Sequence, residues 1–211
     1  MRAFSYVVET DSGFAPNPFW GICTLATCKP EIRKVAQVGD WVFGWGSASM
    51  KMTGRLIFAM RVDEVVSFDL YDRDPRFQCK KPSFSRTPEE RCGDNIYYRD
   101  VPNHWAQREC FHCDDDLKTD LGGVNVLISE YFWYFGKKAS FPPTECTPVT
   151  MKGRGHKANI PDSAVSAAIE WLVESGVSRS NSTLSPSEVR GNQRGSAPTS
   201  IRSPRPGCLL T

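Results

Sequence analysis

The segment Asp40–Gly46 constrains the fold more than any other stretch of this 211-residue sequence. In an extended chain its side chains alternate, so Trp41, Phe43 and Trp45 face one way while a valine and two glycines face the other. A strand with one bulky face and one bare face allows another backbone or a ligand to approach the glycines closely. The segment therefore predicts a strand within a sheet and, on the same strand, a candidate binding surface.

Hydrophobic periodicity predicts further elements on both sides of this strand. We expect strands over residues 4–9, 54–68, 124–129 and 131–135, with a bend at Asp63–Glu64, and helices over residues 30–36 and 161–175. Between residues 69 and 120 the periodicity weakens, which predicts a long excursion of short elements. Together these features predict an α+β fold, built as a small, strongly bent mixed sheet or an open barrel with short helices at its ends.

Composition changes after residue 176, where serine, proline, arginine and glycine replace most apolar residues. We expect residues 1–176 to form one domain and residues 177–211 to form a disordered tail. Five arginines and one glutamate give the segment from Gly176 onward a net charge of +4, so the overall charge of +2 leaves −2 for the domain. A weakly acidic domain is suited to a single nucleotide better than to many phosphates of a duplex.

The sequence has no run of about 18 apolar residues, and its first residues lack the apolar core of a secretion signal. We therefore expect a cytoplasmic protein without membrane contact. In a reducing compartment the eight cysteines are expected to be thiols or metal ligands rather than disulfides.

Cysteine and histidine spacing leaves a metal site as an alternative. The segment Cys110–Cys113 contains His112, and together with His104 and Cys79 or Cys92 it could supply tetrahedral zinc ligands. A second close cysteine pair is absent from the sequence, so we expect no metal and no cofactor. A zinc-stapled interaction protein stays open as the second alternative to the main functional hypothesis.

Long motifs resemble a known family. The stretch Tyr6–Arg33, which contains Phe-Ala-Pro-Asn-Pro-Phe-Trp-Gly, and the stretch Val38–Ser47 are similar to the nucleotide modification associated domain 2 family. Shorter pieces also resemble it: Leu56–Met60, Phe68–Phe77, Gly93–Tyr98, Asn125–Ser129, Tyr134–Gly136 and Gly153–His156. The resemblance implies a role with modified nucleotides in base-modification or phage-type systems. More loosely, the element pattern resembles the PUA-like group, including EVE, ASCH and YTH domains, which receive a flipped base in an aromatic-lined pocket.

A base-binding pocket needs flat apolar faces and a few polar groups that read the edge of the base. We expect these from eight residues: Phe14, Asn17, Trp20, Trp45, Ser47, Asn95, Tyr97 and Tyr98. The two tyrosines alternate across a strand, so only one can face the pocket. Burial in the core is the alternative for Trp45, and turn formation is the alternative for Asn17.

Charged residues indicate where the protein would bind phosphate and where it would transfer protons. Lys29 and Arg33 lie near the start of the first predicted helix, where backbone N–H groups favour anions, and Arg154 lies in a glycine-containing loop. His156 and Asp94 are the candidate acid and base. For the basic residues the alternative is a solvated surface, and for His156 it is a structural or merely exposed side chain.

No phosphate-binding glycine loop, Gly-x-Ser-x-Gly or His-Glu-x-x-His motif occurs, so motifs do not decide whether the protein is an enzyme. The hypothesis preferred here is recognition of a modified nucleobase or nucleotide in an aromatic pocket. Its partners would be a nucleotide or modified nucleic acid and a base-modifying enzyme. An enzyme that modifies nucleotides or DNA bases is the first alternative.

Overall fold

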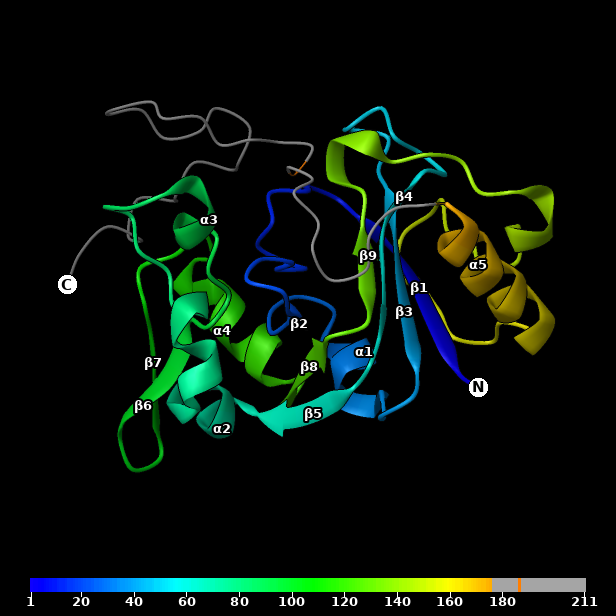
Figure 1. Cartoon of the computed structure of the whole chain (residues 1–211). Helices are drawn as coiled ribbons and strands as arrows, with labels where there is room; N and C mark the ends of the chain where they lie inside the picture. The colour runs from blue at the N-terminus through cyan, green and yellow to red at the C-terminus, as the bar shows by residue number, and fades with distance from the viewer. Residues whose placement is uncertain (176–185, 187–211) are drawn as a thin grey trace.

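The computed structural model describes residues 1–175 and Pro186, so the tail expected over residues 177–211 lies outside the described residues apart from this proline (Figure 1). The elements in chain order are β1 (Ala3–Val8), β2 (Cys23–Leu25), α1 (Pro30–Val35), β3 (Trp41–Gly46), β4 (Leu56–Arg61), β5 (Glu64–Ser67), α2 (Phe68–Arg73), the 3-10 helix η1 (Pro75–Lys80), α3 (Pro88–Arg91), β6 (Tyr97–Val101), β7 (His104–Gln107), α4 (Asp114–Leu121), β8 (Asn125–Ser129), β9 (Phe132–Tyr134), the 3-10 helices η2 (Gly136–Lys138) and η3 (Thr144–Cys146), β10 (His156–Lys157) and α5 (Asp162–Glu174).

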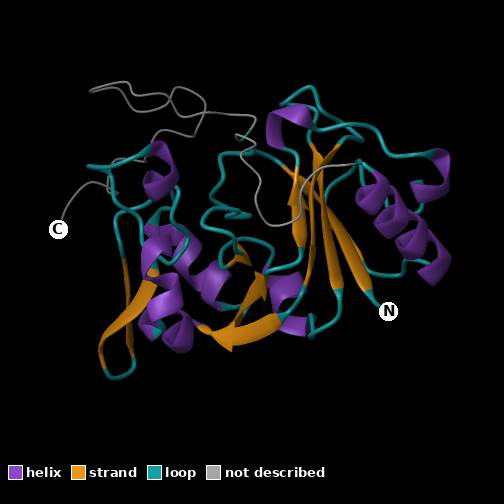
Figure 2. Ribbon diagram, in the orientation of Figure 1, coloured by secondary structure: helices purple, strands orange, loops and turns teal. Residues whose placement is uncertain are grey.

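A five-stranded mixed sheet in the order β10-β1-β3-β4-β9 forms one half of the molecule (Figure 2). Strands β1 and β3 are parallel, and the other pairs are antiparallel. The predicted strand over residues 40–46 is confirmed, and β3 is buried along its whole length. Helix α5 lies beside this sheet (Figure 1), and its stripe of Val165, Ala168 and Leu172 enters the same core.

A long bent ribbon connects this sheet to a second, three-stranded sheet in the order β2-β8-β5. Strand β4 pairs with β9 and strand β5 pairs with β8 in the same register, from Phe58 opposite Tyr134 to Ser67 opposite Asn125, with an interruption at the bend between the two ladders. The ribbon bends at Asp63, whose Oδ2 accepts hydrogen bonds from the backbone N–H groups of Glu130 and Tyr131 at 2.8 and 3.1 Å. The bend predicted at Asp63–Glu64 is therefore confirmed.

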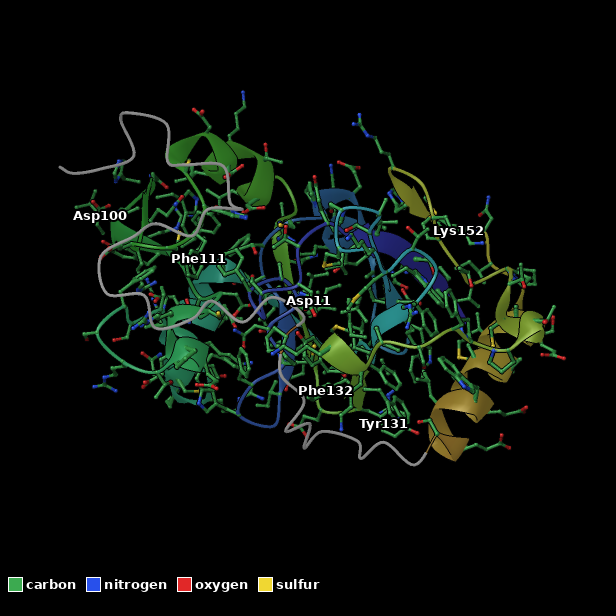
Figure 3. All side chains as sticks on the ribbon, turned by 90° about the horizontal axis from the view of Figure 1, so that it is seen from above. Asp11, Asp100, Phe111, Tyr131, Phe132 and Lys152 are labelled. Atoms are coloured by element: carbon green, nitrogen blue, oxygen red, sulfur yellow. The ribbon has the colours of Figure 1, made fainter. Side chains whose placement is uncertain are left out.

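Short elements from α2 to α4 form the other half of the molecule, as the weak periodicity predicted. They enclose a second apolar cluster that includes Phe14, Tyr71 and Phe77. Viewed from above, Asp100 and Lys152 lie at opposite ends of the molecule, and Asp11 lies near its centre (Figure 3). The loop that follows β1 therefore runs between the two halves.

The α+β class is confirmed, with small mixed sheets that do not close into a barrel in the described part of the chain. The PUA-like resemblance stays a prediction. Within residues 1–175, no helix combines the length and the apolar character that crossing a membrane requires.

The glycines of β3 permit close packing, which gives a test of the fold. A Cβ atom on Gly46 would lie 2.4 Å from the Met52 backbone oxygen, so Gly46→Ala must displace backbone. We expect this substitution to lower the free energy of unfolding by about 2 kcal/mol, measured by urea denaturation. Gly153→Ala is the control, because nothing lies within 4 Å of its Cβ position. Equal stability of the two variants would contradict this packing.

Candidate functional site

Trp45 and Ser47 were predicted to contact a base. In the structure Trp45 lies in the core, and Ser47 forms hydrogen bonds that hold a turn. Trp45 is 1% exposed and packs within the main core, so its ring presents no face to solvent. Ser47 Oγ donates to the Glu9 carbonyl at 2.9 Å and accepts from the Met50 N–H at 3.2 Å. The bare face predicted for this strand is filled, because the Phe58 ring lies against Gly44.

The loop before β2 is held from inside by a buried lysine. Lys80 Nζ donates to Asn17 Oδ1 at 2.7 Å and to the carbonyls of Asn17, Phe19 and Ile22 at 3.0, 3.0 and 2.6 Å. Asn17 is itself completely buried, and its Nδ2 donates to the Gly13 and Cys92 carbonyls. Burial lowers the pKa of Lys80 to about 8, although the charge of Asp94 opposes this shift. These contacts fix the loop backbone without using any surface group.

Trp20 is the candidate that this loop presents to solvent. Its side chain is 41% exposed, and its backbone adopts a left-handed conformation with φ 59° that is uncommon for a non-glycine residue. Lys80 Nζ lies 5.4 Å from the centroid of the Trp20 ring, and the Phe19 ring meets it edge-on at 5.6 Å. Trp20 is therefore an exposed ring on a rigid, buried support.

Asp94 and Asn95 lie beneath this loop, where both are 1% exposed. Asp94 accepts hydrogen bonds from the Thr24 and Tyr71 hydroxyls, each at 2.7 Å. Burial raises the pKa of the Asp94 carboxyl, whereas Lys80 and the two hydroxyls lower it. The Asp94 carboxylate therefore holds α2 against β2. Asn95 Nδ2 donates to the Tyr71 carbonyl of α2 at 2.9 Å and to the Phe77 carbonyl of η1 at 3.3 Å.

The predicted acid and base do not meet. His156 is exposed on β10, opposite Tyr6 of β1 at the edge of the large sheet. Among residues 1–175, no hydrogen bond or ion pair joins His156 to Asp94. Arg154 is exposed on the bend just before β10. The catalytic roles of His156 and Asp94 stay predictions.

Three residues from distant segments meet where β2 leads into α1. Cys28 Sγ lies 3.6 Å from His112 Nε2, and His112 Nδ1 lies 2.8 Å from Asp120 Oδ2. Cys28 comes just before α1, His112 lies just before α4, and Asp120 lies in the last turn of α4. A thiol, an imidazole and a carboxylate in this order form the arrangement in which a base activates a nucleophile and a third group orients the base.

Asp120 is 2% exposed and joins several parts of this cluster. Its Oδ1 accepts from the Cys28 backbone N–H at 2.6 Å, and its Oδ2 accepts from the Tyr97 hydroxyl at 2.8 Å. Arg33 Nη2 donates to the Asp120 backbone carbonyl at 2.6 Å, and the carboxylate of Asp120 lies 3.7 Å from the same nitrogen. Buried Tyr97 is thus part of this cluster. Half-buried Tyr98 lies on the other side of the strand, with the Arg108 guanidinium over its ring.

Arg33, predicted to bind phosphate, is wholly buried and donates to the carbonyls of Cys28, Asn125 and Asp120. Burial lowers the pKa of its guanidinium, although Asp120 opposes the shift. Because the side chain has no exposure to solvent, a phosphate could reach the guanidinium only if the protein opened locally. Lys29 is half-buried beside Cys28, with its Nζ 4.7 Å from the Tyr6 ring centroid, and it is the better placed cation.

The His112 imidazole is positioned to carry a proton. Burial lowers its pKa, but hydrogen bonds with Asp120 and Cys28 outweigh burial and raise the pKa to about 10. Its side chain is 17% exposed, and the Phe14 ring lies 4.8 Å away at an interplanar angle of 66°. Phe14 also meets Phe111 edge-on at 6.2 Å, so aromatic rings adjoin the thiol–imidazole pair.

Sequence reasoning considered His112 only as a zinc ligand and passed over Cys28, Asp120 and Lys80. Cys28 and His112 are 84 positions apart, so no local spacing signals their contact. Both imidazole nitrogens have protein partners, and no set of three or more metal-ligating side chains occurs among the described residues. The position of Cys28 directly before a lysine and a proline was the one local signal of a constrained turn.

The fold and this cluster define a small α+β protein with a polar, partly accessible cysteine–histidine site. The model of the family described as nucleotide modification associated domain 2 matches residues 1–192. The protein belongs to this family, which associates it with nucleotide modification. No curated protein and no solved structure matches the chain.

Replacing the buried lysine tests how the loop is supported. Lys80→Met removes a charged donor from four oxygens, and Asn17 Oδ1 and the Ile22 carbonyl lose the donor described for them, so we expect the free energy of unfolding to fall by about 3 kcal/mol. Lys81→Met is the matched control, because its ion pair with Asp72 is partly exposed and should contribute less than about 1 kcal/mol. Urea denaturation of both variants measures the difference, and a small effect at Lys80 contradicts this account.

The His112 contacts predict a pH dependence of stability. Its pKa rises from 6.5 to about 10 on folding, so the stabilisation is complete below pH 6.5 and is lost as pH rises toward 10. We expect the difference in unfolding free energy between wild type and His112→Gln to shrink over this window. Urea denaturation in the presence of a reductant, repeated across the pH range, measures it. A difference that is constant with pH is incompatible with the prediction.

Proposed function

We propose that this protein recognises a modified nucleobase or nucleotide, within a nucleic-acid modification or phage-defence type system, by stacking the base on Trp20. The observation that carries the proposal is the exposed Trp20 ring, whose backbone is fixed on both sides by hydrogen bonds from buried Lys80. Family membership supports the choice of ligand, because it associates the protein with nucleotide modification.

A rigid exposed ring is suited to stacking because little conformational freedom is lost on binding. Backbone carbonyls on both sides of Trp20, those of Phe19 and Ile22, accept hydrogen bonds from Lys80. Both Trp20 and Gly21 have positive φ values, 59° and 76°, which place the indole at the tip of a tight turn. Stacking of a base on such a ring contributes roughly 1 to 3 kcal/mol.

Two further groups, on the other side of β2 from Trp20, support a role with nucleotides. Lys29 is a half-buried cation in the turn that follows β2, and Phe111 is a partly exposed ring next to His112 in sequence. Three other predicted contact residues have a supporting role. Each is buried and hydrogen-bonded inside the protein, so none of them touches the ligand: Asn17, Asn95 and Tyr97. A nucleotide or a single flipped base fits this arrangement better than a long duplex.

Removing the Trp20 ring tests this function. We expect Trp20→Ala to weaken binding of 5-substituted pyrimidine or N-substituted purine nucleoside monophosphates by about tenfold or more, measured by isothermal titration calorimetry. Phe141→Ala is the matched control, because this 62% exposed ring also carries a cation, with Arg55 4.7 Å from its centroid. The proposal fails if wild type binds none of these nucleotides or if both variants bind equally well.

A further inference from the structure

We infer that Cys28, His112 and Asp120 form a nucleophilic catalytic site that removes an acyl substituent from a nucleotide. Cys28 is the nucleophile, His112 is the acid and base, and Asp120 is a positioning residue. The substrate class rests on the proposed function, whereas the assignment of the nucleophile rests on the geometry alone.

A second histidine–aspartate pair shows what distinguishes this site. His104 Nδ1 lies 2.6 Å from Asp100 Oδ1, but the side chains are 65% and 43% exposed, and within residues 1–175 no thiol contacts this histidine. In contrast, the His112–Asp120 pair is almost buried and directs Nε2 toward a sulfur atom. Burial strengthens the orienting hydrogen bond, and the remaining exposure of His112 leaves a route for substrate.

The backbone of Cys28 is held in an unfavourable conformation. Cys28 and Lys29 have φ values of 58° and 43°, and each left-handed non-glycine residue costs of the order of 1 kcal/mol. The Asp120 carboxylate accepts from the Cys28 N–H at 2.6 Å, and Arg33 Nε donates to the Cys28 carbonyl at 2.7 Å. Two buried charged side chains therefore fix both backbone groups of the residue that carries the sulfur.

Two buried hydroxyls near this site have no hydrogen-bond partner among the described residues. They are Tyr6 Oη and Thr27 Oγ1, on side chains no more than 1% exposed. Thr27 directly precedes Cys28, and the Lys29 ammonium group lies 4.7 Å from the centroid of the Tyr6 ring, so both hydroxyls belong to the surroundings of the nucleophile. Burial raises the pKa of Tyr6, and the charge of Cys28 raises it further.

The reaction proceeds in two balanced steps. First, Cys28 Sγ bonds to the acyl carbon, the bond from that carbon to the leaving nitrogen or oxygen breaks, and His112 Nε2 gives the leaving atom the shared proton. Second, His112 Nε2 takes a proton from water, the hydroxide attacks the thioester, and the carbon–sulfur bond breaks as the thiol regains its proton. The products are a carboxylic acid and a nucleotide that bears the freed amine or hydroxyl.

Acyl transfer suits this cluster because one nitrogen must both take and give a proton during the cycle. Asp120 on Nδ1 keeps Nε2 directed at the sulfur through both steps. The Phe14 ring packs against the imidazole from the core side, and the partly exposed Phe111 ring next to it offers apolar surface to a base. The Lys29 ammonium group is adjacent in sequence to the nucleophile.

Alkylation with iodoacetamide tests the nucleophile without any nucleotide. At about pH 7, peptide mass spectrometry should show Cys28 alkylated at least about tenfold faster than the more exposed Cys79. His112→Gln should remove this advantage, whereas the matched control His104→Gln should retain it, with circular dichroism confirming that both variants fold. Asp120→Asn should shift the pH profile of alkylation. Labelling of Cys28 in wild type no faster than Cys79 overturns the triad, whatever the variants do.

p-Nitrophenyl acetate and acylated nucleotides test the reaction. We expect a burst of nitrophenolate and one acetyl group on Cys28, both lost in Cys28→Ala, followed by acid release from N-acylated nucleoside monophosphates. Acetylation of lysines alone overturns the triad. Acetylation of Cys28 without cleavage of any acylated nucleotide overturns the substrate class. Loss of nucleotide binding with intact Cys28 acetylation counts against the proposed function alone.

Discussion

The carboxylate of Asp120 is the interaction on which the arrangement of this protein most depends. It is almost completely buried, and a buried carboxylate without partners would cost several kcal/mol. Donors from three separate segments satisfy it: the Cys28 N–H, the Tyr97 hydroxyl and the His112 imidazole. The charge therefore fixes the relative positions of α1, β6 and α4, and any change that removes one donor disturbs the other two.

Two buried cations hold the ends of β2 in the same way. Lys80 donates to carbonyls on the chain entering the strand, and Arg33 donates to the Cys28 carbonyl on the chain leaving it. The two surfaces with proposed roles, the Trp20 ring and the Cys28 thiol, lie on these two flanking turns. Their geometry is thus set by the interior of the protein, and surface charges contribute little to it.

Local patterns predicted much of this fold, and long-range contacts explain what they missed. The alternation around Trp41, the bend at Asp63 and the apolar stripe of α5 were correct because each depends on neighbouring residues. The sequence could not show that Arg33 and Lys80 are buried, since such residues are usually exposed and their acceptors lie far along the chain. For the same reason the contact between Cys28 and His112 was not predicted. Of the predicted aromatic contacts, Trp20 is exposed, whereas Phe14 is buried and packs against His112.

The bent ribbon of β4–β5 and β8–β9 has a consequence for how the molecule comes apart. Strand β4 runs on into β5 and strand β8 runs on into β9, so two chain segments, held in the same register, pass from one sheet to the other. Unfolding of either half would pull on both segments at once, so we expect the two apolar clusters to unfold in a single cooperative transition.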